Sequence, residues 1–416
     1  MHRTTRRGWL AAAGATAVAG LAGCAGVGGS SEPVALGSLL PLSGPGALGD
    51  VAADHERAVA AAVEHANRAG GVDGREVVHV SKDTGANPET AAEAYAELTE
   101  DHDVLSVVGP VISDVTASLT ERAADDRQLL VSPSSTAPDL ASAGRTDDGK
   151  FFARTCPNDS QQAAVMAKIV DDDAYASADT ATVFHLDDAF GSALANALEG
   201  TIDADVAATV SYPGGVEDPA PLVDDALAPE PDAVAFVGSP GSSASVLKEL
   251  LAREYEGDVV LSSGLASDNP RPNWTGVYTA SVASANTVGT KRLRRELSDA
   301  APLLVYTMNA YDAAMLPLLA GEYAGEASSP AAADALQTVS GGVGHSVTVG
   351  EFDRARDLVA ADRELNYKGA AGDMDLTDDL EPVTSYLVQQ VAESGLETLE
   401  LLKRGYFGGG SGGGDA

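Results

Sequence analysis

Glycine and hydroxyl side chains mark the stretches of this 416-residue sequence that could hold a ligand. In "LLPLSGPGALGD", Gly44, Gly46 and Gly49 follow the pattern G-x-G-x-x-G after an apolar run. In dinucleotide-binding enzymes, this pattern lets backbone N–H groups approach a pyrophosphate at the start of a helix. Here Pro41–Ser43 separate the first glycine from the run, and Pro45 removes one N–H donor from the turn. The turn therefore fits one wall of a small-solute cleft better than a dinucleotide site.

Two further loops place hydroxyl groups where predicted strands end. "GPVISD" sets Ser113 at the start of a predicted helix, where it can cap the helix while its hydroxyl faces a cleft. "SPSSTAP" sets Ser134, Ser135 and Thr136 between two prolines that restrict the backbone. Hydroxyl and backbone N–H groups can bind a carboxylate without placing a permanent positive charge beside it. Together the loops indicate a site for a small carboxylate.

The motifs of common enzyme classes are absent from the sequence. It contains no G-x-S-x-G nucleophile elbow, no G-x-x-x-x-G-K-[ST] phosphate loop and no H-E-x-x-H. Asp187 and Asp188 are adjacent, but neighbouring loop carboxylates are usually solvated or cap a helix. The seven His residues show no metal-ligand spacing with each other or with cysteine. We therefore expect no catalytic residue, no metal and no cofactor, in a protein that binds its ligand unchanged.

Strands and helices alternate along the chain in a way that would position these loops. Strands are predicted within residues 34–42, 76–83, 103–110 and 128–133. Asn87 followed by Pro88 predicts the start of one intervening helix. The alternation begins again after "FFARTCPND". The predicted fold class is α/β, with two doubly wound parallel-sheet lobes whose ligands bind beyond the carboxyl ends of the strands.

The charge balance narrows the expected partners. Asp and Glu number 62 against 26 Lys and Arg, a formal net charge of -36 that is spread along the whole chain. Because the Debye length falls to about 3 Å near 1 M salt, such a surface suits a protein that works at high salt. The spread argues against the alternative, one acidic patch for a basic partner. The sign of the charge argues against nucleic acid as a partner.

The N-terminus predicts export and a lipid anchor. Arg6 and Arg7 precede an apolar segment shorter than the roughly 20 residues of a membrane-spanning helix, and the paired arginines predict twin-arginine export. Cleavage after residues 1–23 would free Cys24, at the end of "LAGC", for lipidation. Residues 24–33 would then form a flexible linker. A short membrane anchor that is never cleaved is the alternative.

Taken in order, the loops resemble one family. "PLSGPGALG", "GPVISDVT", "SPSSTAPDL", "FFARTCPND", "DDAFGSALANAL" and "NAYDAAMLPLLA" resemble segments of the branched-chain amino-acid type of ABC-transporter solute-binding proteins, which have the type I periplasmic-binding fold. The resemblance covers most of residues 34–391. It implies two lobes, joined by crossings near Thr155, Ala285 and Asp375, that close on a small-molecule solute by a hinge motion. It also implies a monomer that delivers the solute to a membrane permease and its ATPase.

The resemblance sets the expected domain boundaries as well. Lobe 1 would comprise residues 34–155 and 286–376, lobe 2 residues 156–285 and 377–404, and residues 405–416 a Gly-rich tail. With the lipid at Cys24 as its only membrane attachment, the protein would work at the extracellular face of the membrane.

The resemblance also assigns ligand-binding residues. Ser113, Ser134 and Thr136 would hold the solute's carboxylate. The other expected ligand-binding residues lie beside the cleft in the remaining loops: Ser43, Leu48, Phe190, Ser239, Ser263 and Tyr306.

Three departures from the family pattern bear on the solute. Leu48 replaces a common aromatic residue, and Phe190 replaces a tyrosine. Amino-acid binders of the family place an acid near Ser263 to neutralise the ammonium group of the solute, and this sequence has none there before Asp268. Asp187, Asp188 or Asp268 could take that role. An amino acid is the leading expected solute, with an amide, a urea-like compound or a short organic acid as alternatives. Two other functions stay open from sequence: a ligand sensor of the same fold for a signalling partner, and an exported oxidoreductase that uses "GPGALG" for a dinucleotide.

Overall fold

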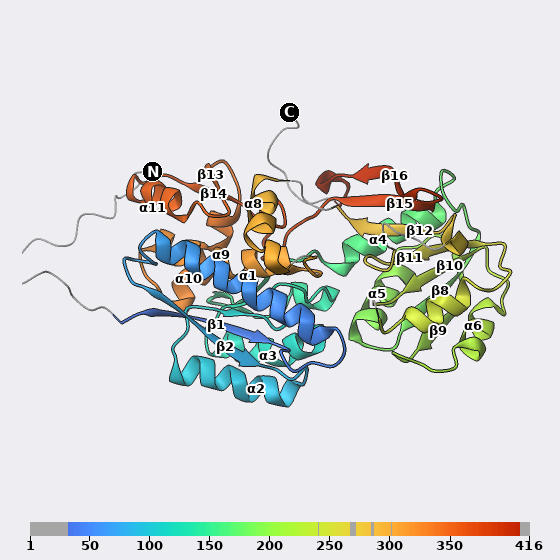
Figure 1. Ribbon diagram of the computed structural model, residues 1–416, viewed down its shortest axis with the longest axis horizontal. Helices are drawn as coiled ribbons and strands as arrows, with labels where there is room; N and C mark the ends of the chain where they lie inside the picture. The colour runs from blue at the N-terminus through green and yellow to red at the C-terminus, as the bar shows by residue number, and fades with distance from the viewer. Residues whose placement is uncertain (1–31, 240, 267–271, 284–286, 301, 408–416) are drawn as a thin grey trace, which may run out of the picture. The chain divides into compact units, whose positions relative to one another are not determined.

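The computed structural model describes residues 32–239, 241–266, 272–283, 287–300 and 302–407 (Figure 1). The predicted signal segment with Arg6, Arg7 and Cys24 lies outside these residues, as do Asp268, Ala285 and most of the predicted tail. Among the described residues, no helix combines the length and the apolar composition that crossing a bilayer requires.

A parallel sheet of five strands, ordered β2-β1-β3-β4-β7, forms the first half of the fold. Its strands are β1 (Val34–Leu40), β2 (Val77–Asp83), β3 (Val107–Val108), β4 (Leu130–Ser132) and β7 (Phe152–Arg154). Every residue of β3, β4 and β7 is buried, as expected for parallel strands covered on both faces. A small hairpin, β5 (Arg145–Thr146) and β6 (Gly149–Lys150), precedes β7.

Helices cover both faces of this sheet. α1 (Leu48–Arg68) packs beside α9 (Thr307–Ala324) in one apolar core, and α2 (Pro88–Ala96) packs beside α3 (Ser113–Asp125) in another. The first core also takes side chains from α8 (Val288–Glu296), α10 (Ser329–Ser340), α11 (Phe352–Ala360), β13 (His345–Thr348) and β14 (Leu365–Lys368).

Two local predictions for these helices are confirmed. The apolar stripe of α1 is buried, with Ala58, Val59 and Ala62 inaccessible to solvent. Asn87 caps α2, because its side-chain oxygen accepts the N–H of Thr90 at 3.0 Å. Such a cap satisfies one of the helix-end donors that would otherwise lack a partner.

A sheet of seven strands, ordered β16-β15-β12-β11-β10-β8-β9, forms the second half. Its strands are β8 (Thr180–Leu186), β9 (Asp205–Tyr212), β10 (Ala233–Val237), β11 (Asp258–Leu261), β12 (Tyr278–Val282), β15 (Tyr386–Ala392) and β16 (Gly395–Leu402). The strands from β9 to β12 are parallel, whereas β15 and β16 are antiparallel. α4 (Asp159–Asp171) and α5 (Ala189–Glu199) share one core, and α6 (Ala220–Leu227) and α7 (Ala244–Leu250) the other.

This architecture confirms the predicted α/β fold class with two sheets between helical layers, one parallel and the other parallel except for β15 and β16. The chain first leaves the five-stranded sheet after Arg154, and α4 then packs on the seven-stranded sheet. It returns after β12, since Leu293 of α8 lies in the first core. It crosses again between Leu380, which is in the first core, and Tyr386, which is in the second. Because sheet-end loops flank each crossing, residues from both halves can meet there.

Candidate functional site

The hydroxyl loops of the five-stranded sheet lie together at its carboxyl edge. Ser113 is the first residue of α3, and its hydroxyl accepts the N–H of Ala137 at 3.4 Å. The Ser134 hydroxyl donates to Val111 O at 3.0 Å, so each loop is bonded to the other. The prediction that Ser113 caps α3 is wrong: the N-cap residue is Ile112 and no side chain caps the helix. Ser113 is already part of the helix, and its hydroxyl instead accepts a hydrogen bond from the loop that contains Ala137.

Ser135 is the interior member of the hydroxyl triplet. It is buried, and its Oγ lies 2.7 Å from Thr116 Oγ1, while its N–H donates to Ser132 Oγ at 3.0 Å. Ser132 in turn donates to Pro110 O at 2.6 Å. Ser135 therefore braces the loop from inside and leaves Ser134 and Thr136 at its flanks.

A chain of hydrogen bonds joins the two sheets. Thr136, which follows β4, donates from Oγ1 to Asp159 Oδ2 at 2.7 Å. Gln162, one turn further along α4, donates to Asp159 Oδ1 at 3.4 Å. The Oε1 atom of Gln162 accepts the N–H of Ser263, which follows β11, at 2.7 Å. A predicted ligand residue of each half is thus tied to the same turn of α4.

Asp159 is the electrostatically unusual member of this chain. Its carboxyl is 2% exposed, and burial raises its pKa to about 7, although the bond from Thr136 and the charge of Arg154 oppose the rise. When Asp159 is ionised, it accepts a hydrogen bond from the Thr136 hydroxyl, so the hydroxyl oxygen can only accept a hydrogen bond from a ligand. When Asp159 is protonated, it can donate instead, and the Thr136 hydroxyl proton becomes available to a carboxylate.

Ser263 and Tyr306 line one cavity of about 550 Å³. Its walls are formed by Val282 and Ala283, by Thr290 and Arg294 of α8, and by residues 302–306, which precede α9. The volume lies within the range of small-molecule sites, and most lining side chains are apolar. The other lining residues are Pro302, Leu303, Leu304, Val305, Thr307, Met308, Asn309, Ala370 and Ala371.

Tyr306 has an unusual backbone conformation in this cavity. It precedes α9 with φ 61° and ψ 10°, the left-handed region, which costs a non-glycine residue free energy. Asn309, one turn later, donates to Thr155 O at 2.7 Å and accepts the Thr155 hydroxyl at 2.8 Å. The start of α9 is therefore fastened to the first crossing, beside the turn that holds Asp159.

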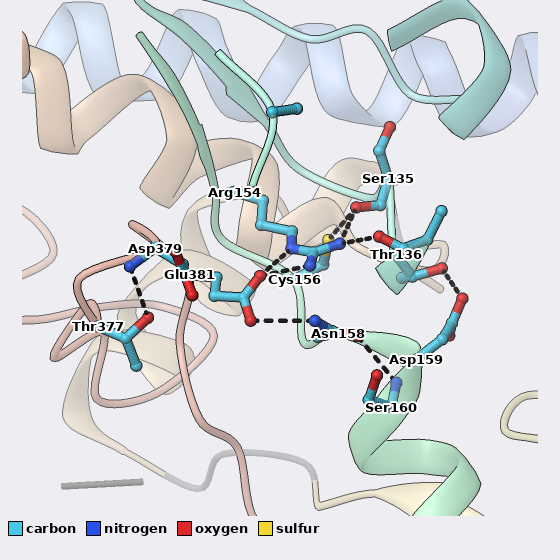
Figure 2. Close-up of polar contacts among 12 residues, drawn as sticks. Ser135, Thr136, Arg154, Cys156, Asn158, Asp159, Ser160, Thr377, Asp379 and Glu381 are labelled. Carbon is cyan, nitrogen blue, oxygen red and sulfur yellow. Dashed lines mark hydrogen bonds and ion pairs between the residues drawn. The ribbon is translucent and has the colours of Figure 1, made fainter. Parts of the chain in front are cut away.

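A buried ion pair fastens the first crossing to the third (Figure 2). Arg154 is inaccessible to solvent and pairs with Glu381, with Nε 2.8 Å from Oε2. Its remaining donors reach Ser135 O at 3.0 Å and Ala137 O at 2.8 Å. Asn158 donates to the other carboxylate oxygen of Glu381 at 3.1 Å. Arg154 thus supports the hydroxyl loop and the crossing at once.

The remaining predicted ligand residues lie in separate loops. Ser43 is exposed, and its N–H donates to Asp83 at 3.2 Å. Leu48 begins α1 and packs half-buried against Leu40, Ala52 and Val111. Phe190 packs half-buried on the core beneath α5. Ser239 is half-buried, and its N–H donates to Ser243 Oγ at 3.0 Å.

The acids proposed to replace the missing ammonium partner have other surroundings. Asp188 caps α5 by accepting the N–H of Gly191 at 2.7 Å, and Asp187 is exposed. Asp159 is the acid that sequence reasoning missed near Ser263. Its signal was present in "NDSQQ", where Asn158 caps a helix and Asp159 and Gln162 are three residues apart on one face. The part of the chain that the structure describes shows no cluster of three potential metal ligands.

Comparison with known proteins identifies the family to which the chain belongs. A family model described as periplasmic binding protein matches residues 33–395. The chain belongs to the periplasmic binding protein family. Members of this family are solute-binding proteins and not enzymes, they bind small molecules, and they act in the periplasm or outside the cell.

Individual relatives agree with this assignment. The chain is 65% identical, over the full length of both proteins, to the chemotactic signal transduction system substrate-binding protein BasB of Halobacterium salinarum. It is 32% identical to the Leu/Ile/Val-binding protein BraC3 of Rhizobium johnstonii over 47% of this chain and 48% of that protein. The leucine-binding protein LivK of Thermotoga maritima has the same fold, with a TM-score of 0.69 at 20% identity, covering 89% of this chain and 99% of that one.

Proposed function

We propose that this protein is the solute-binding component of a chemotactic signalling system. The observation that carries this proposal is the 65% identity over the whole length of both chains to a protein named for that role in Halobacterium salinarum. We propose further that it works at high salt, tethered by lipid at Cys24 to the extracellular face of the membrane. The net charge of -36 and the "LAGC" segment support this.

The solute proposed is a small amino acid with an apolar side chain. The apolar walls of the 550 Å³ cavity suit such a side chain. The Ser113 hydroxyl accepts the N–H of Ala137 and can therefore donate its own proton to the carboxylate. The Ser134 hydroxyl can do the same once it releases Val111 O. Thr136 bonded to an ionised Asp159 can accept from its ammonium group, which supplies the acidic end that sequence analysis could not find. Relatives named for binding leucine, isoleucine and valine favour the same class.

Closure of the two halves would report that the solute has bound. Thr136 and Ser263 come from different sheets, and Asp159 and Gln162 of α4 connect them. A solute that contacts both sides stabilises the closed arrangement by its differential affinity for that arrangement. The closed form would then be recognised by a membrane partner.

Delivery to an ABC permease is the second candidate function. It is favoured by fold relatives such as the Streptococcus pneumoniae branched-chain amino acid transporter substrate-binding protein LivJ, which has a TM-score of 0.68 at 18% identity and covers 89% of this chain and 100% of that one. The same capture of solute would serve either partner.

Calorimetry in molar salt tests the solute, using a panel of apolar amino acids, amides and short organic acids. Tight stoichiometric binding of an apolar amino acid is expected, and the absence of binding across the panel would refute the proposal. Deleting the gene separates the two partners. Loss of the swimming response to that amino acid with uptake intact supports signalling, whereas loss of uptake supports transport.

A further inference from the structure

The two-turn helix α8 carries a concentration of positive charge that is unusual for this chain. Its nine residues, Val288–Glu296, include Lys291, Arg292, Arg294 and Arg295. The whole sequence has only 26 Lys and Arg against 62 Asp and Glu. Acids are abundant enough to pair with every cation, so several cations without acidic partners on one short helix stand out.

Three of these four cations have no carboxylate partner among the described residues. Arg292 is paired, since it donates to Glu351 at 2.8 Å and to Val349 O at 3.0 Å. Lys291, Arg294 and Arg295 form no ion pair or side-chain hydrogen bond with the residues that the structure describes, and all three are exposed. Most other described arginines, including the solvent-exposed Arg57 and Arg122, do contact an acid.

Packing fixes the face of α8 that carries the free charges. Gly289 lies so close to its neighbours that an added Cβ would be 2.6 Å from Thr348 Oγ1. Thr290 donates to Ala370 O at 2.6 Å, and Leu293 is buried in the first core. The opposite side of the helix, where Lys291 and Arg295 are one turn apart and exposed, therefore faces solvent.

We propose that this α8 basic face, formed by Val288, Lys291, Arg294 and Arg295, binds an acidic segment of a protein partner. Charge complementarity defines the occupant: arginine forks pair with carboxylates in direct, bidentate contact. Val288, which is 59% exposed, adds an apolar contact at the start of the face.

The surroundings of the face select a narrow protein segment over a membrane surface. Glu296 and Asp299 follow the basic residues along the chain, and Glu351 holds Arg292 at the other flank. A flat anionic bilayer would meet these carboxylates together with the cations. At about 1 M salt, attraction beyond roughly 3 Å is screened, so only direct pairs contribute, and a single extended or helical segment can make them while avoiding the acids.

The α8 basic face also adjoins the cavity, because Thr290 and Arg294 line it. A partner on α8 and a solute in the cavity would contact the same helix. Binding of one is therefore expected to change the affinity for the other, by the same factor in both directions. The docking surface itself is independent of which solute binds, so it is tested on the solute-free protein.

The test compares two charge-reversed variants of the full chain in molar KCl. Arg294→Glu with Arg295→Glu alters the face but keeps Lys291. Lys248→Glu with Lys403→Glu makes the same change in net charge at exposed, unpaired cations elsewhere. The probe is a fluorescein-labelled polyglutamate peptide, and thermal unfolding checks that both variants fold. We expect the peptide to bind the control like the wild type and the face variant about tenfold more weakly. A water-soluble carbodiimide should join the peptide to the Lys291 amine.

Three results would overturn the proposal. Equal affinity of both variants for the peptide, including no binding at all, removes the face as its site. Binding of phosphatidylglycerol vesicles that depends on Arg294 and Arg295, without peptide binding, assigns the face to a lipid surface. A carbodiimide link from Lys291 to Asp415 of the same chain assigns it to the protein's own tail.

Discussion

Arg154 and Asp159 lie five residues apart at the first crossing, and the fold treats their charges in opposite ways. The Arg154 guanidinium is buried against a full carboxylate, Glu381, and two backbone carbonyls. Asp159 is equally buried, but its bonded partners are a neutral hydroxyl and a neutral amide. The charge of Arg154 is neutralised by an ion pair, whereas Asp159 has no counter-charge bonded to it and can gain or lose a proton.

Because of this difference, Arg154 and Asp159 can serve two purposes, stability and ligand binding, within six residues of the chain. A matched ion pair that links two crossings holds the frame about which the halves can move. A carboxyl with a raised pKa, bonded to Thr136 and through Gln162 to the Ser263 loop, can respond to the charge of whatever enters the site. The residues that fasten the crossings should therefore govern stability, and those around Asp159 should govern binding.

The largest expected effect comes from removing the negative charge of Glu381, which pairs with Arg154. Glu381→Gln leaves the Arg154 charge buried without a counter-charge, which should lower the free energy of unfolding by about 3 kcal/mol. Denaturant unfolding in constant KCl measures the change. Arg145 and Asp379 provide a control, because Asp379 lies two residues before Glu381 and pairs with Arg145 of β5 at 2.8 Å, while both side chains are 49% exposed. Asp379→Asn should cost less than about 1 kcal/mol. Equal losses in the two variants would contradict the special role of burial.

The next effect concerns the pH dependence of stability. Burial raises the pKa of Asp159 from 3.8 to about 7, so the folded protein holds this proton more tightly than the unfolded chain does. Asp159 should therefore lower the free energy of unfolding as pH rises from about 4 to about 7, by at most a few kcal/mol. Asp159→Asn should remove that part of the slope, as measured by denaturant unfolding across this pH range.

Asp312 serves as the control for the same experiment. It is buried in the first core, where Tyr367 and the N–H groups of Ala370 and Ala371 donate to it, and burial raises its pKa to about 7. Asp312→Asn should also change the slope of stability, but only Asp159→Asn should change how solute affinity varies with pH. If both variants alter that affinity profile alike, Asp159 has no special place in the site.

A smaller effect is expected at Gln162. Gln162→Met removes the acceptor of the Ser263 N–H, so the loop after β11 loses its bond to α4. We expect solute affinity to fall about tenfold, equivalent to about 1.4 kcal/mol, in calorimetry with the best solute of the panel. Gln161→Met is the matched neighbour, since Gln161 bonds instead to Pro382 and Thr384 of the third crossing. It should reduce stability and leave affinity within about twofold.

Much of the frame was predictable because it follows simple sequence patterns. β10 is a continuous apolar run and β1 and β8 are mostly apolar, and the amphipathic pattern of α1 maps directly onto its buried side. β16 was not predicted, since most of its residues are exposed or half-buried at the sheet edge and its polar residues interrupt any apolar run.

The site was harder to predict, because its bonds join distant parts of the chain. Sequence placed Thr136 and Ser263 in loops at strand ends, but their connection depends on how α4 meets each sheet. Asp159 was passed over because an acid in the first turn of a helix is common and favours the positive end of the helix dipole. The one-residue error at Ser113 arose because a serine before a helix and a serine in its first turn give the same local pattern.

The smallest expected effect is at Phe190, an uncharged residue that packs on the core of the seven-stranded half. Its ring is half-buried on the core beneath α5, so Phe190→Tyr should fold with unchanged stability and add one hydroxyl at the ring edge. If that edge faces the solute, an apolar amino acid should bind up to about fivefold more tightly, a gain of about 1 kcal/mol from one hydrogen bond. Phe190→Leu, which removes the ring, should weaken binding. Tighter binding by the tyrosine variant would show that this half contacts the polar end of the solute. Unchanged binding in both variants would place Phe190 outside the site and leave solute recognition to the turn of α4 that holds Asp159.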